Sequence, residues 1–192
     1  MTSIAVLIDG GFVRSAATKD DKVYEPKFIE KFGLSCKGKD EVIHRILYYD
    51  CAPCLSKTKL PVSGANHQFA GNDQWLHDLA RKDYFAVRRG VLKFRGWEPK
   101  NVPMAAKPTD ADFVPRFEQK GVDMRIGLDM ANYAANRAVG LLVLVTNDTD
   151  CIPAMKYARR AGLQVALVSL PNRSTTPELM AHCDFLRKVE WP

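Results

Sequence analysis

The sequence lacks the features that mark secreted and membrane-spanning proteins. Its five cysteines are an odd number, and its N-terminus has no basic region followed by an apolar stretch and a small-residue cleavage site. These absences argue against a disulfide framework and against a signal peptide. No apolar run approaches the roughly 20 residues of a membrane-spanning helix. We therefore expect a cytoplasmic protein that makes no use of a membrane.

Several familiar catalytic motifs are also missing. The chain has no G-x-x-x-x-G-K-[ST] loop, no G-x-G-x-x-G loop and no serine nucleophile elbow. The D-x-D pattern of haloacid-dehalogenase-like phosphatases would need an aspartate at position 11, which is Gly11. Cys51 and Cys54 form one C-x-x-C, but no second pair completes the four ligands of a structural zinc site. These observations disfavour nucleotide-loop enzymes, serine hydrolases and zinc proteins.

The composition is that of a globular protein. The 192 residues are 46% hydrophobic and 26% charged, with a net charge of +6. This length and composition predict one domain, residues 1–192, with a sizeable core. The modest basic excess is compatible with a polyanionic partner but also with an unspecialised basic surface.

Strand-like and helix-like segments alternate along the chain. The expected strands are Ile4–Ile8, Val42–Tyr49, Leu141–Val145, Gln164–Leu170 and Phe185–Val189. The expected helices are Phe12–Ala17, Phe28–Phe32, Asp73–Lys82, Met124–Arg137, Ile152–Ala161 and Glu178–His182. Tyr84–Trp97 is expected to be a strand or a hairpin turning at Gly90, between irregular segments at Cys51–Gly71 and Lys100–Pro115. This alternation predicts an α/β fold with a mainly parallel sheet and helices on both faces.

Aspartates follow two of the buried strands. Asp9 ends "IAVLID" and Asp148 follows "LLVLVTN", while Asp123 precedes a helical segment. Ligands bind at the carboxyl ends of strands in open parallel sheets. Carboxylates gathered there repel one another unless a hard divalent cation joins them. We therefore expect a Mg²⁺ or Mn²⁺ site.

Structural roles compete with this interpretation. Asp150 is placed either to cap the next helix or to bind the ion, and Asp9 can serve as a turn residue before glycine. Asp148 has no such alternative role in the sequence. Asp129 lies six residues beyond Asp123, on a different helix face, so we favour Asp123 and place Asp129 second.

Three motifs resemble the NYN branch of the PIN-like nucleases. They are "IAVLIDGG", "KGVDMRIGLDM" and "VLVTNDTDCIPAMKYARRAGLQVALV", and they occur in the order typical of that family. The resemblance implies a PIN-like three-layer α/β/α sandwich, a Mg²⁺ or Mn²⁺ cofactor and ribonuclease activity. It also implies an acidic cluster of Asp9, Asp123, Asp148 and Asp150, with Thr146 as a small hydroxyl residue and Asn147 beside it. Many NYN proteins have asparagine where this chain has Phe12.

The segment "YFAVRRGVLKFRGW" is the candidate RNA contact. It interleaves aromatic residues with four cations, Arg88, Arg89, Lys93 and Arg95. Cations meet phosphates and aromatic faces stack on unpaired bases in many RNA-binding proteins. The alternative is a sheet strand with buried aromatic residues and solvated arginines, which we weigh slightly more heavily.

The leading hypothesis is a metal-dependent ribonuclease acting on single-stranded or structured RNA. The alternative is a non-catalytic RNA- or protein-binding module that keeps the fold. A metal-dependent phosphatase for small phosphoesters is a third possibility. The sequence leaves open whether the chain forms a homo-oligomer and how many ions bind.

Overall fold

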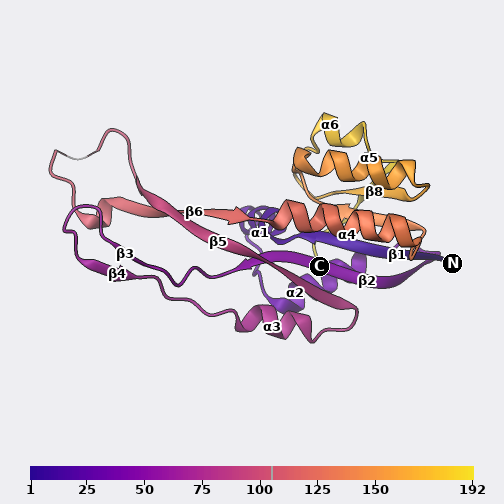
Figure 1. Cartoon of the computed structure of the whole chain (residues 1–192), viewed down its shortest axis with the longest axis horizontal. Coiled ribbons are helices and arrows are strands. Elements are labelled where there is room, and N and C mark those ends of the chain that lie inside the picture. The colour runs from indigo at the N-terminus through magenta and orange to yellow at the C-terminus, as the bar shows by residue number, and fades with distance from the viewer. Residues whose placement is uncertain (105) are drawn as a thin grey trace.

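A seven-stranded sheet forms the centre of the molecule (Figure 1). The structure, a computed structural model, describes residues 1–104 and 106–192. The strands are β1 (Thr2–Asp9), β2 (Glu41–Ala52), β5 (Phe85–Pro99), β6 (Phe113–Lys120), β7 (Leu141–Val145), β8 (Gln164–Ser169) and β9 (Phe185–Lys188), in the order β6-β5-β2-β1-β7-β8-β9. Every neighbouring pair is parallel except β5 and β6.

Helices cover both faces of this sheet. They are α1 (Gly10–Lys19), α2 (Pro26–Ser35), α3 (Gln74–Ala80), α4 (Val122–Asn136), α5 (Ile152–Arg160) and α6 (Pro177–Met180). Ile4, Val6 and Ile8 of β1 share one core with α1, α2 and α3. Ala5 and Leu7 face the other way and share a second core with α4, α5 and α6. Because successive strand residues face opposite sides, the continuous apolar run of β1 supplies both cores. The predicted three-layer α/β/α fold is confirmed.

The expected irregular segments contain strands that the sequence pattern did not reveal. Cys51–Gly71 includes a small antiparallel hairpin, β3 (Lys57–Lys59) and β4 (Asn66–Gln68). Lys100–Pro115 ends in a short 3₁₀ helix at Asp110–Asp112 and the beginning of β6. Tyr84–Trp97 contains one long strand without a turn at Gly90. Three-residue strands carry too little periodicity to detect, and Pro115 is tolerated in β6 because an edge strand needs fewer ladder hydrogen bonds.

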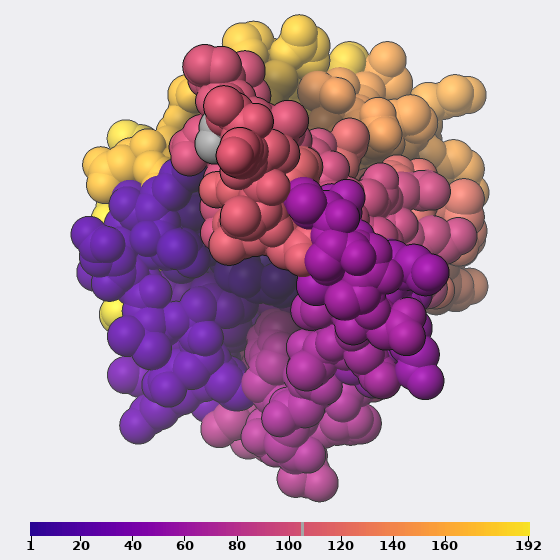
Figure 2. Space-filling view, turned by 90° about the vertical axis from the view of Figure 1, so that its left-hand side faces the viewer, coloured from indigo at the N-terminus to yellow at the C-terminus, as the bar shows by residue number. Residues whose placement is uncertain are grey.

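An arm extends from the sheet beyond the end of β2 (Figure 1). We define the arm as residues 53–71, 91–104 and 106–120, which comprise the β3–β4 hairpin, the distal part of β5, and β6. Figure 2, viewed from the tip of the arm, shows the β3–β4 segment (magenta) beside the β5–β6 segment (red). Aromatic side chains join the two hairpins: Phe69 lies 5.0 Å from both Phe94 and Phe117, and 5.8 Å from Trp97, between ring centroids. The arm therefore has a small apolar centre of its own.

None of the helices within the described residues has the length and apolar character needed to cross a bilayer.

Candidate functional site

Three aspartates line one pocket at the carboxyl-terminal edge of the sheet. Asp9 is the last residue of β1, Asp148 follows β7, and Asp123 lies in the first turn of α4. The full lining is Asp9, Gly11, Phe12, Gln119, Val122, Asp123, Asn147, Asp148 and Thr149. Because β1 and β7 are parallel neighbours, their carboxyl ends bring Asp9 and Asp148 to the same edge. The structure thus places these three residues around a shared space.

Thr146 links the carboxylate of Asp9 to the backbone of Asp148. Its hydroxyl donates to Oδ2 of Asp9 at 3.1 Å and accepts from the backbone N–H of Asp148 at 3.2 Å. Thr146 is buried, so its bond to Asp9 is shielded from water and its bond to Asp148 partly so. The neighbouring Asn147 is fixed in a different way, because its Oδ1 accepts from the N–H and the hydroxyl of Thr176 at 3.0 and 2.8 Å. The strand end therefore holds its polar groups in defined orientations.

The carboxylates repel one another. Burial raises the pKa of Asp9 above its ordinary value, and the charge of Asp123 adds to that increase, although hydrogen bonds from Phe12 and Thr146 oppose it. Burial also raises the pKa of Asp123, followed by the charges of Asp148 and Asp150. A shared pocket of partly desolvated carboxylates without a neutralising cation is electrostatically costly. The pocket therefore favours a positively charged ligand.

Two of the aspartates also cap helical turns. Oδ1 of Asp9 accepts from the backbone N–H of Phe12 at 3.1 Å at the start of α1. Oδ1 of Asp148 accepts from the N–H of Asp150 at 2.9 Å, which makes Asp148 the cap of the 3₁₀ turn Thr149–Cys151. The sequence interpretation offered capping as an alternative role for Asp150 and none for Asp148, whereas in the structure Asp148 is the cap. The reason is that a 3₁₀ turn precedes α5 and begins at Thr149, three residues before the expected helix.

The donor chemistry of the pocket fits a hard divalent cation. Carboxylate oxygens are the protein ligands that Mg²⁺ prefers, and Mn²⁺ accepts the same donors. Asp9, Asp123 and Asp148 supply these oxygens from three different elements. Within residues 1–104 and 106–192, however, no three histidine, cysteine, aspartate or glutamate side chains already stand at metal-ligand spacing. Binding a cation would thus require the carboxylates to draw together, and their convergence on one ion stays a prediction.

The remaining acidic candidates lie outside the pocket lining. Asp150 is exposed beyond Asp148, near enough for its charge to act on Asp123. Asp129 points elsewhere along α4: its Oδ2 accepts from the hydroxyl of Tyr49 at 2.9 Å and from Nε of Arg88 at 3.0 Å. The different helix face expected for Asp129 is the one observed.

The four cations of the candidate RNA segment have different environments. Arg88 pairs with Asp129 at 3.0 Å, and Arg89 pairs with Asp73 at 2.6 Å. Arg95 forms an ion pair with Glu118, whereas Lys93 is exposed on the arm. Phe85 is buried in the sheet core, and Phe94 and Trp97 belong to the aromatic centre of the arm, whereas Tyr84 is half exposed. Phe85 is therefore too buried to stack on an unpaired base, and stacking by the other rings of the segment stays a prediction.

Sequence reasoning missed Asp50, a fully buried carboxylate near the end of β2. It accepts hydrogen bonds from the Tyr48 hydroxyl at 2.9 Å and from the Cys51 N–H at 2.7 Å, and it forms an ion pair with Arg14. Gln119, which lines the acidic pocket, donates to Asp50 at 3.4 Å. The signal was the same as for Asp9, an aspartate directly after a strand-like run, but position 50 was assigned to no element.

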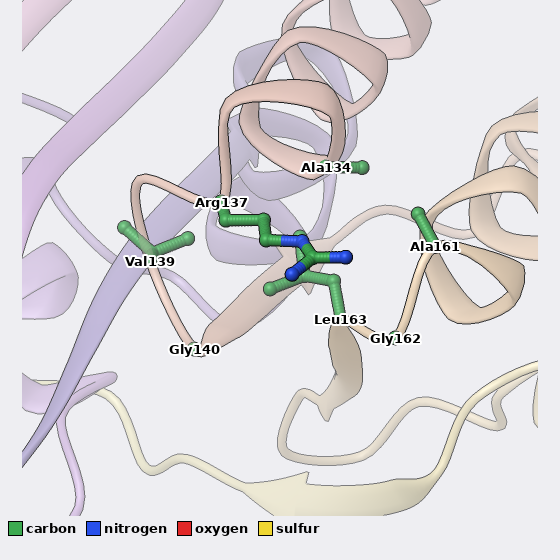
Figure 3. A pocket seen from close by; sticks show the side chains of 7 residues that line it. All are labelled: Ala134, Arg137, Val139, Gly140, Ala161, Gly162 and Leu163. Carbon is green, nitrogen blue, oxygen red and sulfur yellow. The ribbon is translucent and has the colours of Figure 1, made fainter.

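A different pocket lies at the opposite, amino-terminal end of the strands (Figure 3). It is lined by Ala134, Arg137, Val139, Gly140, Ala161, Gly162 and Leu163. Arg137 is the one charged residue in this set, and the set holds no carboxylate. This lining offers no ligand set for a cation, which leaves the acidic pocket as the better candidate for metal chemistry.

Comparisons with known proteins agree with this architecture. The chain superposes on the crystal structure of VPA0982 from Vibrio parahaemolyticus, a protein of unknown function, with a TM-score of 0.56 and 16% sequence identity. The match covers 97% of this chain and 92% of VPA0982, and at this identity it shows a shared fold alone. A comparison with curated proteins found no match. The sequence model of the NYN domain family matches residues 3–190, nearly the whole chain. The chain therefore belongs to the NYN domain family.

Proposed function

We propose that this protein is a metal-dependent ribonuclease that hydrolyses RNA phosphodiester bonds at the acidic pocket. The observation that carries the proposal is the placement of Asp9, Asp123 and Asp148 around one space at the carboxyl ends of parallel strands. Their uncompensated charge is the electrostatic complement of a Mg²⁺ or Mn²⁺ ion. When bound, such an ion activates water, polarises the phosphoryl oxygen and stabilises the leaving oxygen.

The chain's own groups have separate tasks in this proposal. Asp9, Asp123 and Asp148 would hold the ion, and the buried hydroxyl of Thr146 would keep Asp9 in place. The Thr176 N–H fixes Oδ1 of Asn147 as an acceptor, so the Asn147 amide NH₂ is the end available to a phosphate oxygen. The N-termini of α1 and α4 also meet the pocket and add partial positive charge near the scissile phosphate.

Family membership supports the proposal at a coarser level. The NYN domain family is nuclease-like and PIN-like, which favours a hydrolase acting on nucleic acid. Its members are generally associated with divalent ions, without an indication of which ion applies here. Phe12 and the open spacing of the carboxylates favour the alternative, a binding module that has kept the fold without catalysis.

Cleavage assays with a matched control separate these functions. Wild type, Asp148→Asn and Asp21→Asn would be incubated with single-stranded and hairpin RNAs, with Mg²⁺, with Mn²⁺ and with EDTA. Asp21 is exposed after the C-terminal end of α1, so its substitution makes the same charge change away from the pocket. We expect wild type and Asp21→Asn to cleave RNA when Mg²⁺ or Mn²⁺ is present and not in EDTA. Equal cleavage by Asp148→Asn, or none by wild type, would reject the nuclease assignment at this pocket.

A further inference from the structure

The arm carries most of the net positive charge of the chain. Its sequence includes eight lysines and arginines and four acidic residues, a net charge of +4 compared with +6 for the whole chain. The arm begins where β5 passes the end of β2, at the pairing of Ala52 with Val91. Since β1, β2 and β5 are parallel, the arm leaves the same edge of the sheet that holds the acidic pocket.

The acidic residues of the arm are already engaged within it. Glu118 pairs with Arg95 and Lys120, and Glu98 pairs with Arg116. Oδ1 of Asp110 accepts the N–H groups of Val62 and Ser63 at 2.9 and 3.1 Å. Asp112 accepts from the N–H of Thr109 at 2.7 Å and from its hydroxyl at 2.9 Å. Four exposed lysines, Lys57, Lys59, Lys93 and Lys107, form no ion pair with any described carboxylate.

Most aromatic residues of the arm pack against one another, although Phe117 remains 36% exposed. Phe69 is buried, and Phe94 and Trp97 lie 5.4 Å apart between ring centroids in the same cluster. Nε1 of Trp97 donates to the carbonyl of Lys59 at 2.8 Å, which fixes the indole between the two hairpins. Phe69 and the indole of Trp97 would have to leave this cluster to turn fully outward, and that would separate the hairpins. The outer surface of the arm thus offers lysine ammonium groups, which contact phosphates without reading bases.

A direct connection joins the arm to the pocket. Gln119 lies on β6, lines the acidic pocket and donates to Asp50 at 3.4 Å. From there, the distal part of β5 runs nine residues from Val91 to Pro99. At about 3.3 Å per residue this is roughly 27 Å, the length of about eight nucleotides at roughly 3.4 Å each.

From these observations we infer that the arm is a second binding site, which holds the phosphate backbone of an RNA strand that extends from the acidic pocket. The inference rests on the proposed ribonuclease function, because the pocket defines where the strand begins. Lys57, Lys59, Lys93 and Lys107 make the contacts, and the contacts are independent of base sequence. RNA too short to leave the pocket gains nothing from the arm.

The test compares two fourfold variants with equal changes in charge. The arm variant carries Lys57→Gln, Lys59→Gln, Lys93→Gln and Lys107→Gln. The control variant carries Lys27→Gln, Lys31→Gln, Lys37→Gln and Lys39→Gln, four exposed lysines on and after α2, outside the arm. Both are made in an Asp148→Asn background. Anisotropy measures the binding of labelled oligo(U) and oligo(A) across a salt series. Each RNA is made about 5 and about 20 nucleotides long, one shorter and one longer than the span of the arm.

We expect the arm variant to bind the longer RNAs roughly 10- to 100-fold more weakly than the control variant does. The slope of log K against log salt should fall by about 0.7 for each lost phosphate contact. The shorter RNAs should bind both variants equally, and oligo(A) and oligo(U) should respond alike. Equal binding by the two variants, an equal loss for short and long RNAs, or a loss restricted to one base would overturn the inference.

The binding readout keeps this inference separate from the proposed catalysis. If the arm lysines hold long RNA but the wild type cleaves nothing, the arm inference stands and the nuclease assignment fails. If the wild type cleaves RNA and the arm variant matches the control at both lengths, the arm inference alone fails. If no RNA of either length binds, the arm inference is rejected.

Discussion

The buried hydroxyl of Thr146 donates to Oδ2 of Asp9 at 3.1 Å and thereby fixes the carboxylate that ends β1 to the end of β7. Residues 137 positions apart in the sequence are thus joined at the edge of the sheet where ligands of parallel sheets bind. The same hydroxyl accepts from the Asp148 N–H, so one side chain orients the polar groups of two strands.

Thr146→Val tests this link with nearly unchanged side-chain volume. We expect RNA cleavage to fall roughly 10- to 100-fold, the effect typical of losing a residue that orients a metal ligand. Thr146→Ser keeps the hydroxyl and should keep most of the activity. Metal affinity measured by calorimetry should follow the same order. Full activity in Thr146→Val would show that Asp9 needs no such support.

The sequence predicted the sheet core and the ends of the two strands that precede Asp9 and Asp148, because these depend on local apolar runs. Leu141–Val145 was predicted with the bounds that the structure has, and Ile4–Ile8 lies within β1. Asp9 and Asp148 followed from their positions directly after those runs. The capping role of Asp148 was not predicted because the start of a 3₁₀ turn leaves no periodic signal.

The arm and Asp50 were beyond the reach of such patterns. The arm depends on contacts between rings distant in sequence, such as Phe69 with Phe117, which no local period reveals. The charge of Asp50 is compensated by Arg14, which lies on α1, 36 residues away. Long-range pairing of this kind is fixed by tertiary packing and not by propensity.

Gly10, the first residue of α1, packs closely against Tyr48 and Tyr49 of β2, next to the acidic pocket. A Cβ at Gly10 would lie 2.4 Å from Oη of Tyr48 and 2.8 Å from the backbone carbonyl of Tyr49. Tyr48 cannot move away freely, because it is buried and its hydroxyl bonds to Asp50 and lies 2.7 Å from Oη of Tyr24. We expect Gly10→Ala to lower the free energy of unfolding by about 1–3 kcal/mol. Calorimetry should then show a fall in Tm of roughly 3–10 °C.

Gly127→Ala is the matched control for this substitution. Gly127 lies inside α4, and a Cβ there would meet Ala154 at 3.6 Å, an ordinary contact. Because alanine is the better helix former, we expect a gain of about 0.5–1 kcal/mol. An unchanged Tm in Gly10→Ala would mean that β2 and α1 separate more easily than their packing indicates.

Glu41 and Arg187 tie the beginning of β2 to β9. Two hydrogen bonds of 2.5 and 2.8 Å join the largely buried side chains. Burial raises the pKa of Glu41, but the bonds from Arg187 and the Gly38 N–H outweigh it and leave that pKa lowered. A lowered pKa in the folded state stabilises the protein above the unfolded value of about 4.3, and this contribution is lost as pH falls through the folded pKa.

Glu41→Gln should therefore be less stable than wild type at pH 7, by about 2–4 kcal/mol, since Arg187 loses its charged partner. The difference should shrink as pH falls from about 5 toward 3, where wild type loses the same contribution. Urea unfolding across this range measures it, with the exposed Glu190→Gln as control. A difference that stays constant with pH would assign the effect to lost packing instead of lost charge.

Substituting Asp148 and Asp150 separately tests which carboxylates take part in catalysis. Asp148 lines the pocket, while Asp150 is exposed outside its lining, and both substitutions to asparagine remove one charge. Asp148→Asn should leave the turn capped, because asparagine is as good an N-cap as aspartate. We expect Asp148→Asn to lower cleavage at least about 100-fold, whereas Asp150→Asn has a smaller effect.

RNA binding should persist or tighten in Asp148→Asn because one fewer carboxylate repels the phosphates. The metal-free protein should also become more stable, since burial and the charge of Asp148 both raise the pKa of Asp123 and one of these is removed. Equal loss in both variants would place Asp150 among the ligands, and loss in Asp150→Asn alone would move the site away from the pocket.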